Sequence, residues 1–142
     1  MAYQHTQVGY GMAVISLGLA AIVAVIARSP DSFGVMCLLV GIAATMFSTL
    51  TTAVDAEAVR VRFGPIGLIR TRVALADITA ARAMRTSPVS GWGMRYVRHG
   101  RLWNLWGLDA VELQLKNGTR FLIGTDEPQA LVQALRHVGV RT

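Results

Sequence analysis

Two long stretches without a charged side chain dominate the first 54 of the 142 residues in this sequence. Residues 8–27 form a stretch of twenty, and residues 33–54 form a stretch of twenty-two. Twenty helical residues extend about 30 Å, which is the thickness of the hydrocarbon core of a bilayer. Neither stretch has the polar face that a helix at a protein surface needs. The sequence therefore predicts a transmembrane helical hairpin with spans of about 8–27 and 33–54, rather than two buried helices of a soluble bundle.

The five residues 28–32 join the two predicted spans, and Pro30 and Asp31 among them favour a turn. So short a connection makes the two helices antiparallel neighbours. Small residues recur every four positions in both, and such residues allow close packing of membrane helices. We expect these positions to lie at the hairpin seam or at a subunit contact; they are Ser16, Ala20 and Ala24 in the first helix and Gly41, Thr45 and Thr49 in the second.

The distribution of basic residues predicts an orientation for this hairpin. A cleaved signal peptide is the alternative for the first stretch, but residues 1–7 contain no Lys or Arg. The connection carries one basic residue, Arg28, whereas four arginines follow the second stretch closely. Because the basic side stays in the cytoplasm, both termini are predicted to be cytoplasmic, in the plasma membrane of a bacterial cell.

The charged residues lie almost entirely in the rest of the chain. Residues 52–142 hold 13 of the 14 basic and 7 of the 8 acidic residues, so the net charge of +6 belongs to them. The single cysteine, Cys37, excludes an internal disulfide. We therefore divide the chain into an N-terminal tail (1–7), a transmembrane hairpin (8–54) and a cytoplasmic domain (55–142).

The pattern of residues 55–142 is typical of a small mainly-β domain. In residues 58–63, apolar side chains alternate with Arg60 and Arg62, as in a half-buried strand. Asn117 and Gly118 separate two alternating stretches and predict a tight hairpin. A helix begins near residues 125–129, with Asp126 as the expected N-cap and with Leu131 and Leu135 on its apolar face. We expect about seven antiparallel strands closed by one C-terminal α-helix.

This order of elements resembles the bacterial PH-like domains that are attached to transmembrane hairpins in small membrane proteins. The resemblance is carried by residues 60–65 (RVRFGP), 91–96 (GWGMRY), 111–124 and 125–128 (TDEP), and it covers about six tenths of the chain. It implies a PH-like split barrel of two near-orthogonal sheets with a C-terminal helix. It implies no enzyme, because such domains bind lipids, peptides or proteins, and a fold alone fixes no function.

Arginine and tryptophan side chains are the candidate contact residues. Arginine holds phosphate through two hydrogen bonds, and both residue types are enriched at binding hot spots. A loose likeness to phosphoinositide-binding PH domains lies in the spacing of the arginines on the first two predicted strands. The alternative is that the arginines only solvate the outer faces of strands and the tryptophans fill the core. The candidates for contact with a partner or a lipid headgroup are Arg60, Arg62, Arg70, Arg72, Trp92, Arg95, Arg98, Arg101, Trp103 and Trp106.

The sequence offers no catalytic, metal or cofactor motif. The three histidines show no metal-ligand spacing, and residues 91–93 lack the third glycine of a dinucleotide-binding loop. We expect a non-enzymatic integral membrane protein, without cofactor, whose PH-like domain docks a protein partner or another copy of the chain. The alternative is a module that binds anionic lipid headgroups at the membrane surface. A membrane tether argues against nucleic acid as a partner.

Overall fold

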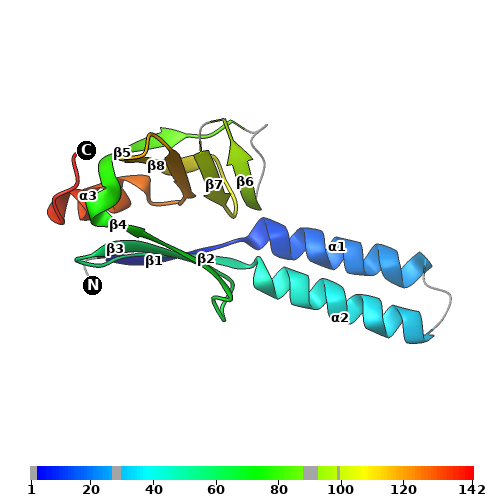
Figure 1. Ribbon diagram of the computed structural model, residues 1–142. Helices are drawn as coiled ribbons and strands as arrows, with labels where there is room; N and C mark the ends of the chain where they lie inside the picture. The colour runs from blue at the N-terminus through cyan, green and yellow to red at the C-terminus, as the bar shows by residue number, and fades with distance from the viewer. Residues whose placement is uncertain (1–2, 27–29, 88–92, 99) are drawn as a thin grey trace.

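The computed structural model describes residues 3–26, 30–87, 93–98 and 100–142, which form two β-sheets and three α-helices (Figure 1). Sheet A consists of β1–β4 and sheet B of β5–β9. In chain order the elements are β1 (Tyr3–Val8), α1 (Tyr10–Ile26), α2 (Pro30–Met46), β2 (Thr49–Val54), β3 (Ala58–Phe63), β4 (Ile69–Ala74), the 3-10 turn η1 (Leu75–Asp77), β5 (Ile78–Arg85), β6 (Gly93–Val97), β7 (Gly100–Asn104), β8 (Asp109–Leu115), β9 (Arg120–Gly124) and α3 (Pro128–His137).

Sheet A is antiparallel throughout, in the order β1-β2-β3-β4, and the two long helices are inserted between β1 and β2. The register pairs Val8 with Thr49 beside the helices and Tyr3 with Val54 at the opposite end of the strands. In β3 the apolar side chains are buried and the arginines are exposed, as the alternation predicts. Residues 3–7, expected in the tail, and Val8, expected at the start of the first span, therefore form an edge strand of the body.

Sheet B has the order β5-β8-β9-β7-β6, and its only parallel pair in the described chain is β7 with β9. The predicted hairpin is confirmed, since β8 and β9 pair across Asn117 and Gly118. Gly118 has φ +81°, a conformation that favours glycine, and the Asn117 side-chain oxygen accepts a hydrogen bond from the Thr119 backbone N–H at 3.0 Å.

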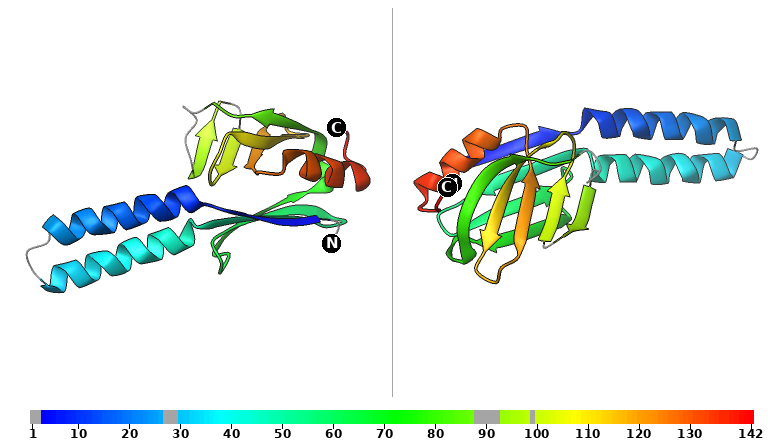
Figure 2. Two further views of the ribbon diagram at one scale, coloured as in Figure 1. Left: turned by 180° about the vertical axis from the view of Figure 1, so that it is seen from behind. Right: turned by 90° about the horizontal axis from the view of Figure 1, so that it is seen from above.

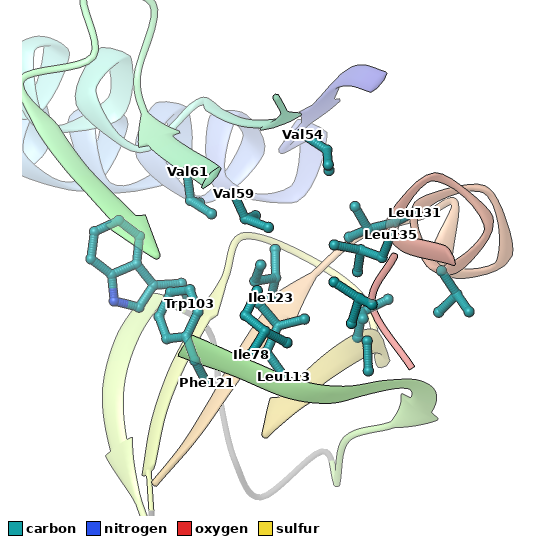
Figure 3. Close-up of a cluster of buried hydrophobic side chains, with 14 of the residues drawn as sticks. Val54, Val59, Val61, Ile78, Trp103, Leu113, Phe121, Ile123, Leu131 and Leu135 are labelled. Carbon is teal, nitrogen blue, oxygen red and sulfur yellow. The ribbon is translucent and has the colours of Figure 1, made fainter. Parts of the chain in front are cut away.

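One hydrophobic core lies between the two sheets and α3 (Figure 3). Valines of sheet A face Leu113 and Ile123 of sheet B, and Trp103 lies beside Phe121. Leu131 and Leu135 of α3 are fully buried, as predicted. The helix closes the end of the sandwich that lies away from α1 and α2 (Figure 2).

The start of α3 differs from the prediction in its capping. Glu127, not Asp126, is the N-cap residue, and its side chain makes no capping hydrogen bond. The Asp126 carboxylate instead lies 2.6 Å from Nε2 of His5 in β1. His5 thereby joins the first strand of sheet A to the entrance of the last helix.

Helices α1 and α2 form an antiparallel pair, here called the arm, which projects from the sandwich (Figures 1 and 2). Half-buried side chains mark the seam, namely Ser16, Ala20 and Val23 in α1 and Cys37, Val40 and Ala44 in α2. The small-residue prediction is therefore right for Ser16 and Ala20. Gly41 and Thr45 are exposed, so they do not lie at the seam, and Thr49 belongs to β2. The side chain of Ala24 lies outside the described residues.

The two predicted transmembrane spans are wrong. Each arm helix has 17 residues, about 25 Å at the helical rise, and no helix in the described parts of the chain is long and apolar enough to cross a membrane. The uncharged stretches were longer than the helices because strands take up their ends: Val8 lies in β1, and residues 49–54 form β2. The absence of charge does not distinguish a helix from a buried strand.

The same finding overturns the predicted integral membrane protein, its plasma-membrane location and the predicted orientation of the termini. The predicted PH-like barrel of about seven antiparallel strands is also wrong. The described residues form nine strands in sheets of four and five, one of them contributed from before the arm and one pair of them parallel. The pattern of residues 55–142 could not reveal strands whose partners lie in residues 3–8 and 49–54.

Candidate functional site

Four of the candidate arginines lie together on the outer face of sheet A. The register of β3 and β4 places Arg60 opposite Arg72 and Arg62 opposite Arg70. Directly paired residues share a face, and all four are exposed, so they form a two-by-two cluster on the side away from the core. The same alternation that buries the apolar side chains of β3 produces this cluster.

Two of these arginines are neutralised by carboxylates that flank the β2–β3 turn. Arg60 Nε lies 3.0 Å from Asp55 Oδ2, and Arg72 Nη2 lies 3.1 Å from Glu57 Oε2. Neither Arg62 nor Arg70 has an ion-pair partner among the residues that the structure describes. Like charges directly opposite each other destabilise a sheet. Binding of an anion between Arg62 and Arg70 would therefore be favourable.

The second group of candidate arginines lies on the β6–β7 hairpin of sheet B and is divided between its faces. Arg101 pairs with Tyr96, and its guanidinium carbon lies 5.7 Å from the centroid of the Tyr96 ring. Arg95 pairs with Leu102 on the opposite face, and Arg98 is exposed in the turn. Gly93–Val97 and Gly100–Asn104 are thus strands that carry arginines on both faces.

The tryptophans do not form one contact surface. Trp103 is 9% exposed and packs against Phe63 and Phe121, with ring centroids 5.4 and 5.9 Å away. Trp106 is partly exposed and lies against Gly11 at the root of the arm. Trp92 lies outside the described residues. Trp103 is therefore a core residue, in line with the alternative left open for the tryptophans.

A groove between the edge strand β4 of sheet A and one end of the strands of sheet B brings residues of both arginine groups together. It has a volume of about 820 Å³ and is lined by β4, the facing ends of β6 and β7, and the β8–β9 turn. Arg72 and Arg101 both line it, although they belong to different sheets. Its other ionisable side chains are Lys116, Arg120 and Asp77, so it holds four cationic side chains and one carboxylate.

Lys116 and Arg120 were not among the residues predicted from the sequence. Both lie next to the turn at Asn117 and Gly118, and the predicted hairpin could have placed them at one end of the sheet. What it could not show was that this end faces β4. Arg120 also approaches the buried Glu112 carboxylate at 3.6 Å, whereas Arg82 binds Glu112 at 2.9 Å.

The remaining cluster of ionisable groups is at the start of α3. His5 lies 2.6 Å from Asp126 and 3.4 Å from Glu127. Burial, together with the charges of Glu127 and Asp126, raises the pKa of Tyr3 to about 12. No group of three potential metal ligands with suitable geometry occurs in the described part of the chain. This cluster therefore fastens β1 to α3.

Comparison of the chain with protein-family models and with curated proteins gives no match. The resemblance to membrane-anchored PH-like proteins is thus wrong on two counts: no family model supports it, and the helices of the described residues do not span a membrane.

Proposed function

We propose that this chain is a non-enzymatic interaction protein that self-associates through its arm and presents the β-sandwich outward. The observation that carries the proposal is the placement of exposed apolar side chains. Of the 19 large hydrophobic side chains exposed in the described residues, 13 lie on α1 and α2. Examples are Leu17 at 72% and Val25 at 85% exposed in α1, and Leu38 at 63% in α2.

The extent of this surface supports a protein interface. Side chains of this size at these exposures present on the order of 100 Å² each, so the arm presents roughly 1,000 Å² of apolar surface, above the largest patch on a typical monomer. A standard interface buries about 800 Å² per partner. The arm therefore offers enough apolar area for a stable contact, and leaving it in water is unfavourable.

A second copy of the chain is the occupant that we propose. Asp31 is the one charged residue within the two arm helices, so the arm presents almost no charge by which a partner of opposite charge could be selected. An apolar surface is complementary to itself, and a two-fold dimer places the same surface on both sides of the contact. The arm projects beyond the sandwich, so two arms can pack without the sandwiches colliding (Figure 1).

Light scattering coupled to size-exclusion chromatography of the full chain, in buffer without detergent, tests the proposal. We expect the wild type to be a dimer or a larger discrete assembly. Leu17→Lys and Leu38→Lys should shift it toward the monomer, because each places a charge in the contact. Ile66→Lys is the matched control: Ile66 is 73% exposed but lies on the β3–β4 connection, so the assembly should persist.

Two results would overturn this proposal. One is a wild-type chain that stays monomeric at tens of micromolar. The other is an arm that is covered by lipid instead of protein. Phospholipid vesicles or detergent micelles would then bind the wild type but not Leu17→Lys. Chemical cross-linking would give no product that joins two chains.

A further inference from the structure

We propose that the groove beside β4 binds an extended acidic polypeptide segment, which adds to the free edge of β4 as a further strand of sheet A. The groove is separate from the arm, so this inference does not depend on the proposed self-association. It is built from four observations: the unpaired edge, the direction of its backbone groups, the charge of the lining, and the dimensions of the groove.

The edge strand β4 has one partner in the described chain, β3. β4 contributes Thr71, Arg72, Val73 and Ala74 to the lining of the groove. An edge strand presents unpaired backbone N–H and C=O groups that can accept another strand. The groove thus contains a template for strand addition.

The hydrogen-bond pattern shows which backbone groups face the groove. Leu75 donates its N–H to Glu57 at 2.9 Å, directly beyond the last pair of β3 and β4. In an antiparallel ladder, hydrogen-bonded pairs alternate with pairs whose N–H and C=O groups point away from each other. Counting back from Leu75, the groups of Ala74, Arg72 and Arg70 point away from β3 and toward the open edge.

The charge of the lining selects an acidic segment. Arg101 and Lys116 have no ion-pair partner in the described residues, and both are exposed. Arg72 pairs with Glu57, but that carboxylate is 79% exposed, so a carboxylate of the ligand can replace it at little cost. Asp77 is the single carboxylate of the lining.

A polypeptide fits the groove better than a free phosphate or a lipid headgroup does. A phosphate could satisfy the cations but not a row of backbone donors and acceptors spaced along a strand. Strand addition supplies both, since the backbone gives affinity and alternate side chains give specificity. A volume of about 820 Å³ accommodates the side chains of a short segment.

Fluorescence anisotropy with the full chain and a fluorescein-labelled peptide of four Glu-Val repeats tests the inference. We expect saturable binding that weakens as salt is added, and at least tenfold weaker binding of the corresponding Lys-Val peptide. Arg101→Ser combined with Lys116→Ser should weaken binding of the acidic peptide at least tenfold. Arg95→Ser combined with Arg98→Ser is the matched control, because it removes the same charge from exposed positions outside the groove lining.

A second variant tests strand addition without changing any charge. Ala74 has φ −65°, which is the value that proline imposes, and its N–H faces the open edge. Ala74→Pro should therefore keep the melting temperature of the wild type and weaken binding at least tenfold. A peptide with methyl groups on alternate backbone amides should bind as weakly.

Three outcomes would overturn the inference. Undiminished binding to folded Ala74→Pro, or of the methylated peptide, would exclude strand addition. If the groove variant and the control variant lost the same affinity for the acidic peptide, the effect would come from the overall charge of the protein and not from the groove. Full competition by inorganic phosphate or by anionic vesicles at low millimolar concentration would assign the site to a phosphate ligand.

Discussion

Gly11, in the first turn of α1, lies so close to the indole ring of Trp106 that a methyl group on the glycine would overlap the ring. Trp106 is held in place from the other side, since its backbone carbonyl accepts a hydrogen bond from Gln7 Nε2 at 2.8 Å. Gly9 fits against Leu105 in a similar way. The start of α1 thus packs against the β7–β8 connection. Trp106 is therefore a residue that positions the arm.

Replacing Gly11 by alanine should disrupt the packing of α1 against Trp106. Overpacking at a close contact costs about 1–3 kcal/mol, so the free energy of unfolding of Gly11→Ala should fall by about that amount. Chemical denaturation measures it, and the tryptophan emission should shift as the indole moves. Gly18→Ala is the control: Gly18 has no neighbouring atom within 4 Å, and alanine there should raise stability by up to about 1 kcal/mol through helix propensity. Equal effects of the two substitutions on stability would contradict close packing of Gly11 against Trp106.

The core role of α3 predicts a large effect of Leu135→Ala. Leu135 is fully buried between the sheets, and truncating a buried leucine costs about 2–5 kcal/mol. The urea midpoint should fall accordingly. Gln133→Ala, on the exposed face of the same helix, should change stability by no more than about 0.5 kcal/mol. An unchanged midpoint for Leu135→Ala would show that α3 is not part of the core.

The pKa of Tyr3 predicts a loss of stability in alkali. Its pKa is raised from 10.0 to about 12 in the folded chain by burial and by the nearby carboxylates. Between these values the unfolded chain loses the phenolic proton and the folded chain keeps it, so the free energy of unfolding falls as the pH rises from 10 toward 12. Denaturant unfolding at pH 9 and pH 11.5 should show a smaller fall for Tyr3→Phe. An identical pH dependence of the two proteins would rule out a raised pKa for Tyr3.

The buried carboxylate of Glu112 predicts a specific cost for its removal. Its side chain is 2% exposed and lies 2.9 Å from Arg82 Nη2. Glu112→Gln keeps the shape but places an amide beside arginine donors, and we expect a loss of about 1–3 kcal/mol. Glu57→Gln, which breaks an exposed pair with Arg72, should cost about 0–1 kcal/mol. Thermal unfolding of both variants at one salt concentration tests the difference.

Parts of the fold that depend on local pattern could be predicted from the sequence. The alternation in β3 predicted which side chains are buried, and Asn117 with Gly118 predicted the β8–β9 turn. The apolar spacing predicted the buried face of α3. The capping of α3 was predicted wrongly because Asp126 binds His5, a residue 121 positions away that local pattern cannot reveal.

The candidate site likewise combines features that local pattern predicts with features that only the tertiary structure decides. The sequence predicted Arg72 on a strand and Arg101 at the end of a turn, and strand period alone put Arg72 on an exposed face. It could not show that the two line one groove with Lys116 and Arg120, because that depends on how the strand ends of sheet B face β4. Composition suggested that Trp103 was a contact residue, but its neighbours Phe63 and Phe121 make it part of the core.

The sequence by itself determined that residues 8–27 and 33–54 are apolar and carry no charged side chain, so that contact with water is unfavourable for them. Only the tertiary structure decided where helix ends and strand begins within these stretches. Thr49–Val54 is a strand because it pairs with Tyr3–Val8 on one side and with Ala58–Phe63 on the other. Pairing across forty residues depends on the whole core that both strands help to form, and no local period in the sequence reports it.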